Sequence, residues 1–143
     1  MAKQVYWDDV EVGMRIPDLH KQATTQQLVR YAGASGDFYQ IHYDKDFAQA
    51  TGLPERIVHG ALKHAFLGRM LHEWVAPGGS VKRVACQYRG MDLVNTDVVC
   101  KAVVAAKRSE DGQNLVDLEV WTETSSGEQT TPGTATVALP SRG

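Results

Sequence analysis

The stretch Gly36-Asp37-Phe38-Tyr39-Gln40-Ile41-His42 places a carboxylate and an imidazole five residues apart, in a segment that is neither clearly helix nor clearly strand. An acid and a base on an irregular segment between two rigid elements are a common arrangement for a catalytic pair. An Asp after Gly is also an ordinary turn residue, and a single His beside aromatic residues is often structural. The spacing alone therefore leaves a catalytic and a structural interpretation open.

Helix signals surround this stretch. Thr24 or Thr25 is predicted to cap a helix that ends near Gly36, and Asp44 is predicted to cap a short helix through about residue 50. Residues 57–74 carry apolar side chains at helical spacing over much of the circumference, so this central helix is expected to be largely buried. The apolar positions are Ala61, Leu62, Ala65, Phe66, Met70, Leu71 and Trp74.

Beyond position 80 the pattern changes to strands. Short polar turns separate the apolar stretches, which favours an antiparallel sheet. We expect a bulge or bend at Pro132-Gly133. Because the sheet and the central helix each need an apolar surface to pack against, the simplest arrangement is α+β, a curved sheet wrapped around the helix in a single domain over residues 1–143. The predicted strands are 19–23, 81–88, 98–106, 115–121 and 131–139, with turns at 109–114 and 125–128.

Composition and charge narrow the function classes. The 143 residues carry a formal net charge of -2, which offers no basic surface for nucleic acid or an anionic membrane. No apolar run is long enough to span a bilayer, and the N-terminal residues lack the apolar core of a signal peptide, so a cytoplasmic location is expected. Cys86 and Cys100 are expected to be buried thiols rather than a disulfide. No metal-binding motif is present, and no metal or other cofactor is expected.

Two blocks of the chain resemble the MaoC-like hydratases and dehydratases, a hot-dog fold family that includes the (R)-specific enoyl-CoA hydratases. The first runs from Tyr31 through Gly36-Asp37 to Ile41-His42 and on to Ala48, and the second is residues 57–62, Ile-Val-His-Gly-Ala-Leu. Two blocks at the right separation are far more specific than either alone. The resemblance departs where the family has Asn-Pro and this chain has Tyr39-Gln40, and where the family has Met and this chain has Ala61.

The resemblance implies a hydratase or dehydratase that acts on a trans-2-enoyl or (R)-3-hydroxyacyl thioester carried by CoA or by acyl carrier protein. Asp37 and His42 are the implied catalytic pair that activates water. The amide of Gly60 is the implied oxyanion donor at the start of the central helix. Tyr31, Phe38, Tyr39, His59 and Ala61 are the candidate substrate-binding residues, although Tyr31 is equally well explained by core packing and His59 by capping or bracing the helix start.

Two other functions remain open. A hot-dog thioesterase would attack the thioester carbonyl with a carboxylate on the central helix, where the nearest candidate is Glu73 at the far end. A non-catalytic acyl-binding subunit of a heteromeric dehydratase is the third interpretation, supported by the altered Tyr39-Gln40 pair. An exposed sheet edge favours a homodimer, with a heterodimer as the second expectation.

Overall fold

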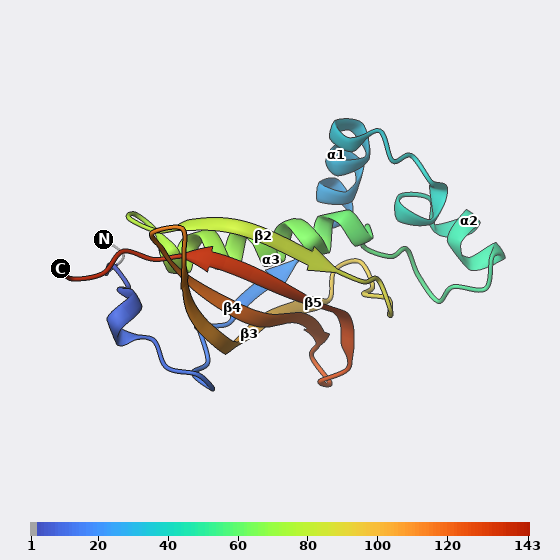
Figure 1. Ribbon diagram of the computed structural model, residues 1–143. Coiled ribbons are helices and arrows are strands. Elements are labelled where there is room, and N and C mark those ends of the chain that lie inside the picture. The colour runs from blue at the N-terminus through green and yellow to red at the C-terminus, as the bar shows by residue number, and fades with distance from the viewer. Residues whose placement is uncertain (1–2) are drawn as a thin grey trace.

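A five-stranded antiparallel sheet curls around one long helix, α3, in the computed structural model (Figure 1). The structure describes residues 3–143. The strand order is β1-β3-β4-β5-β2, so β1 and β2 form the two edges. This architecture confirms the α+β prediction. The strands are β1 (Leu19–Gln22), β2 (Ser80–Cys86), β3 (Asp97–Glu110), β4 (Gln113–Thr124) and β5 (Gln129–Ala138).

Helix α3 (Gly60–Val75) supplies the side of the core that faces the sheet. Ala61 and Ala65 are exposed, so the prediction that they belong to the buried face is wrong. The reason is that the sheet covers only one side of the helix, and the small residues lie on the other side. Lys63, in contrast, is buried among the apolar residues of α3. The buried positions are Leu62, Lys63, Phe66, Leu67, Met70, Leu71, Trp74 and Val75.

Helices α1 (Thr25–Ser35) and α2 (Lys45–Ala50) lie together beyond the N-terminal end of α3, at one end of the molecule (Figure 1). The predicted caps are present. Thr24 Oγ1 accepts a hydrogen bond from the Gln27 amide at 3.2 Å, and Asp44 Oδ1 accepts one from the Phe47 amide at 3.0 Å. Gly36 closes α1 with a φ of 79°, a conformation that glycine adopts without strain. The segment between α1 and α2 is therefore held at one end by the turn at Gly36 and at the other by the cap at Asp44.

Strands β3 and β4 are longer than the sequence pattern predicted. A single turn at Asp111 and Gly112 joins β3 to β4, where the pattern predicted a polar turn over residues 109–114. Both turn residues have positive φ, 51° and 75°, which matches the twist of a tight hairpin. The ends of β3 and β4 at this hairpin are exposed to solvent and carry polar side chains, so the sequence pattern did not indicate that these residues pair as strands. The three-residue helix η1 (Trp7–Asp9) precedes the sheet, and the three-residue helix η2 (Gln40–His42) lies between α1 and α2.

The predicted bulge at Pro132-Gly133 is misplaced. Pro132 pairs with Trp121 in regular register, and the extra residue is Thr130, because Thr122 faces Thr131 while the next β4 residue, Glu123, faces Gln129. The glycine at position 133 is explained by close packing rather than by a bulge, because a Cβ there would lie 2.1 Å from the Ala85 carbonyl oxygen of β2. The bulge at Thr130 turns that side chain into the interior, where it is fully buried.

Cys86 and Cys100 are free thiols, as expected, although Cys86 is only partly buried. Burial raises the pKa of the Cys100 thiol to about 12. No helix within residues 3–143 combines the length and the apolar character needed to cross a membrane.

Candidate active site

Asp37 is held on the turn that follows α1. Its amide donates to Ser35 Oγ at 3.2 Å, and its Oδ1 accepts from the Tyr39 amide at 3.3 Å. These contacts form a local turn of the kind that Asp favours, and they leave Oδ2 free. The side chain is 48% exposed, so the carboxylate lies at the protein surface.

His42 is the buried member of the pair. It lies in η2, its side chain is 8% exposed, and its Nδ1 is 2.7 Å from the Ile57 carbonyl oxygen. A carbonyl oxygen only accepts hydrogen bonds, so Nδ1 carries a proton and donates it there. In the neutral ring Nε2 therefore has a free lone pair. That nitrogen faces Asp37 Oδ2 at 3.8 Å.

The 3.8 Å separation between Asp37 Oδ2 and His42 Nε2 is too long for a direct hydrogen bond. Both atoms are acceptors when the carboxylate is ionised and the imidazole is neutral. A single water molecule can donate one hydrogen bond to each of two acceptors that face each other. The arrangement is thus suited to holding a water between a carboxylate and an imidazole.

His59 supports this pair from behind. Its ring is fully buried and stacks on the His42 ring, with centroids 3.8 Å apart and an interplanar angle of 20°. Its Nε2 donates to the Asp37 carbonyl oxygen at 3.3 Å, and Tyr31 packs against it edge-on at 4.8 Å. The side chain makes no hydrogen bond to the start of α3, which does not support the capping interpretation, and its contacts are instead to Asp37, His42 and Tyr31.

Burial, and to a smaller degree the neighbouring His42, lower the pKa of His59. With Nε2 donating, Nδ1 is an unprotonated acceptor, and it has no hydrogen-bond partner within residues 3–143. A proton added at Nδ1 would find no acceptor, and burial away from water disfavours a positive charge on this ring. His59 is therefore a neutral support for His42 rather than a second base.

Gly60 opens α3 directly after His59. The amides of Leu62 and Lys63 both donate to the His59 carbonyl oxygen, whereas those of Gly60 and Ala61 have no acceptor in the described part of the chain. A Cβ at Gly60 would lie 2.7–2.9 Å from three ring carbons of Tyr88. The ring of Tyr88 thus fills the space that a side chain at position 60 would occupy, a contact that the sequence did not reveal. The free amides make this helix start a donor site.

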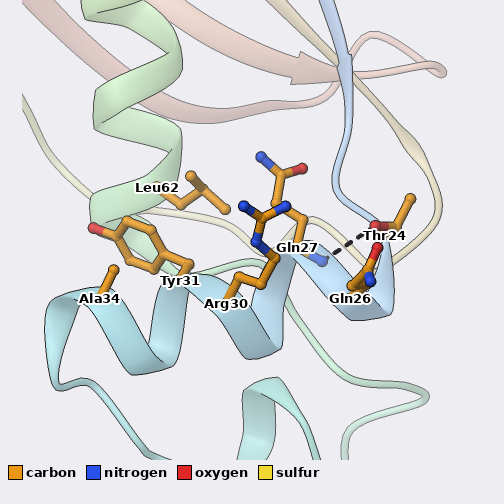
Figure 2. Close-up of a pocket in the computed structure, with 7 residues that line it drawn as sticks. All are labelled: Thr24, Gln26, Gln27, Arg30, Tyr31, Ala34 and Leu62. Atoms are coloured by element: carbon orange, nitrogen blue, oxygen red, sulfur yellow. Dashed lines mark hydrogen bonds between the residues drawn. The ribbon is translucent and has the colours of Figure 1, made fainter.

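Tyr31 borders a cavity of about 510 Å³ between α1 and the start of α3. In Figure 2, Tyr31 and Arg30 project from α1 towards the side of α3 that carries Leu62. The other candidate substrate-binding residues do not line it. Phe38 and Tyr39 are more than half exposed, Ala61 is exposed and His59 is buried. The structure thus gathers Asp37, His42, His59 and Gly60 at one place, with only Tyr31 at the cavity.

Asp37, His42 and His59 each offer a ligand atom within 4.8 Å of the others, as in some metal sites. The stacking of the two imidazoles argues against that use. Nitrogen lone pairs lie in the ring planes, so nearly parallel rings 3.8 Å apart do not direct them at one ion about 2.0 Å away. The donor set is better matched to a bound water.

Sequence reasoning missed three residues near this site. Tyr88 covers Gly60, and Lys63 forms an ion pair with Asp92 at 2.8 Å in the interior. A lysine at a position of the apolar stripe was the available signal, since lysine is almost never fully buried unless it is paired. His64 Nε2 lies 3.0 Å from the Val84 carbonyl oxygen, so this histidine has a structural contact.

Comparison with known proteins places this fold in a class. The chain is similar to the (R)-hydratase from A. caviae involved in PHA biosynthesis, with a TM-score of 0.83, 26% identity, and coverage of 92% of this chain and 98% of that one. Together with the curled sheet and the buried helix, this likeness defines a hot-dog fold of the hydratase type, as the two sequence blocks predicted.

Residues 11–126 match the MaoC like domain, and the chain belongs to that family. It is 27% identical over 139 residues to the (R)-specific enoyl-CoA hydratase of Rhodospirillum rubrum, which covers 96% of this chain and 94% of the relative. It is also 32% identical over 95 residues to fatty acid synthase subunit beta of Saccharomyces cerevisiae. That match covers 65% of this chain but only 4% of the much longer subunit.

Proposed function

We propose that this protein adds water reversibly to trans-2-enoyl thioesters, giving (R)-3-hydroxyacyl thioesters, with Asp37 and His42 as the catalytic pair. The observation that carries the proposal is the pair of facing acceptors, Asp37 Oδ2 and His42 Nε2, 3.8 Å apart. The hydratase relatives and the family membership support the same reaction type.

The reaction needs a water that loses one proton as its oxygen bonds to Cβ, and a proton delivered to Cα. Water held between Asp37 and His42 has both hydrogens directed at bases. One member of the pair takes a proton from the water as the new C–O bond to Cβ forms and the C=C π bond breaks, and the same group, now protonated, delivers that proton to Cα. Dehydration uses the same groups in reverse.

Negative charge builds on the thioester oxygen between these steps. The free amide of Gly60 at the N-terminus of α3 is the donor we assign to that oxygen. The positive end of the helix dipole favours the same charge. Removing one such donor typically costs about 100- to 1,000-fold in rate, so this contact is a substantial part of the proposed catalysis.

The cavity between α1 and α3 is the place we assign to the acyl thioester. Its volume of about 510 Å³ falls within the range of small-molecule sites. Leu62 and Tyr31 give it an apolar side next to the start of α3, and Arg30 gives it a positive charge. The carrier is CoA or acyl carrier protein, both of which present a phosphorylated pantetheine arm. No cofactor takes part in the proposed reaction.

We also propose a homodimer, with a heterodimer as the alternative. Both β1 and β2 are edge strands, and an unpaired edge invites a partner strand. Phe38, Tyr39 and Tyr88, all from the site segments, are each more than half exposed. Light scattering after gel filtration measures the mass directly, and a monomer at micromolar concentration would contradict this part of the proposal.

The test of the activity uses crotonyl-CoA and a longer trans-2-enoyl-CoA. Loss of the enoyl absorbance without release of free thiol is the expected result. Thiol release would instead indicate a thioesterase, for which the carboxylate on α3 is Glu73, exposed and paired with Arg69 at the far end of the helix. Neither signal would favour a non-catalytic acyl-binding subunit.

A further inference from the structure

A buried ion pair lies beneath the candidate active site. Lys63, in the first turn of α3, is 2% exposed, and Asp92 is 1% exposed. Lys63 Nζ donates to Asp92 Oδ2 at 2.8 Å and to the Gly90 carbonyl oxygen at 3.0 Å. Burying two charges costs free energy that an apolar pair of the same size would not, so stability alone does not account for this pair.

The network extends to the bulge of β5. Thr130 Oγ1 donates to Asp92 Oδ2 at 2.7 Å and lies 2.8 Å from Thr122 Oγ1. The Thr130 carbonyl oxygen accepts from the amides of Arg89 and Gly90. The bulge therefore serves to direct Thr130 at the ion pair, and the 89–92 segment is fixed at several points.

Asp92 is joined through its backbone to the segment that carries the hydrogen-bond partner of His42. The Val58 amide donates to the Asp92 carbonyl oxygen at 2.8 Å, and the Val94 amide donates to the Arg56 carbonyl oxygen at 3.0 Å. Between these two bonds lies Ile57, whose carbonyl oxygen accepts from His42 Nδ1. The position of that oxygen decides which nitrogen of His42 is free to face Asp37.

The same network reaches the other side of the site. Gly90, held by Lys63 Nζ, follows two residues after Tyr88, whose ring lies against Gly60. One buried ammonium group thus holds both the segment behind His42 and the segment that covers the start of α3. The ammonium group of a lysine has three N–H donors and can hold several acceptors at once, whereas an apolar side chain offers no hydrogen bonds.

We propose that the Lys63–Asp92 pair is a positioning device that fixes His42 as the Nδ1–H tautomer, with Nε2 directed at the water site. Neither residue contacts the substrate. The expected effect of the Lys63–Asp92 pair on the reaction rate rests on the proposed function. Its effect on the His42 ring is independent of any activity.

The test compares wild type with Lys63→Met/Asp92→Asn, which removes both charges and keeps an acceptor for Thr130. Val75→Ala, at the buried far end of α3, is the control for a general loss of core packing. ¹⁵N NMR of the labelled histidine rings reports the tautomer of His42, assigned with His42→Gln. Enoyl-CoA hydration reports kcat and KM.

We expect a wild-type His42 spectrum of the Nδ1–H form, and a mixture of tautomers in the double variant. We expect kcat to fall about 10- to 100-fold with KM changed less than about threefold, as for loss of other groups that orient a catalytic residue. Val75→Ala should keep the wild-type ring signal. An unchanged His42 tautomer in the folded double variant would overturn the proposal, even if the rate falls. If wild type shows no hydration, the proposed function fails while the ring spectrum still decides this inference.

Discussion

Gly60→Ala is the substitution for which stability and activity are expected to separate most clearly. The new Cβ would lie 2.7 Å from the Tyr88 ring, which must retreat by about 0.8 Å to reach ordinary carbon–carbon contact. Tyr88 is 56% exposed, so its ring has room to move, at a cost of about 1 kcal/mol. Alanine offsets this by up to about 1 kcal/mol through its higher helix propensity. The free energy of unfolding should therefore change by less than about 1 kcal/mol.

The rate should respond far more strongly. A methyl group beside the Gly60 amide obstructs the approach of the thioester oxygen, and we expect kcat/KM for enoyl-CoA hydration to fall about 100-fold. Urea unfolding and the enoyl absorbance assay on the same preparation measure the two quantities. A Gly60→Ala enzyme within about threefold of the wild-type rate would refute the assignment of this amide.

Tyr88→Ala separates the two reasons for glycine at position 60. In that background the added Cβ meets no ring, so Gly60→Ala should become neutral or stabilising, with a coupling free energy of about 1 kcal/mol between the two positions. The loss of rate caused by Gly60→Ala should persist. If Tyr88→Ala instead abolishes that loss, Gly60 serves only to accommodate the ring, and the oxyanion role is wrong.

Three further predictions address the pKa shifts and the caps. The pKa of His59 is lowered in the folded chain, so the folded state loses stability relative to His59→Gln as the pH falls below about 6.5, by at most about 1.4 kcal/mol per pH unit. Urea unfolding of both proteins between pH 7.5 and 5 measures this loss. If the free energies of unfolding of the two proteins change equally with pH, the prediction is wrong. Burial raises the pKa of Cys100 to about 12, so a thiol reagent at pH 8 should leave it unmodified until the chain is unfolded, and rapid labelling of the native protein would count against its burial. Asp44→Ala removes the cap bond to the Phe47 amide and should cost about 1 kcal/mol in urea unfolding, whereas Asp44→Asn, which keeps an acceptor, should cost less; equal losses would show that the cap bond is not responsible.

The elements of the fold were predictable because their signals are local. Caps at Thr24 and Asp44, the left-handed Gly36 and the alternating strands all follow from short-range chemistry. Two errors followed from long-range causes. Gly133 is explained by the close approach of β2, and the bulge at Thr130 by a buried carboxylate 38 residues earlier in the chain. Neither contact is visible in a single stretch of sequence.

The candidate site divides in the same way. The spacing of Asp37 and His42 left their role open, and the resemblance of the two sequence blocks implied that they act as a pair. Both lie on one short connection between helices. The stacking of His59 on His42, the cover of Gly60 by Tyr88 and the burial of Lys63 depend on how distant segments pack. Composition offered a weak signal only for Lys63, as a charge within an apolar stripe.

Single and double substitution of the acid and the base test the central claim most directly. If Asp37 and His42 hold one water and act as a unit, Asp37→Asn and His42→Gln should each lower kcat for crotonyl-CoA hydration by about 100- to 10,000-fold. The double variant should then be no more than about tenfold slower than the worse single variant, with all three proteins folded. A rate for Asp37→Asn within twofold of wild type, or a double variant whose loss equals the product of the two single losses, would contradict it.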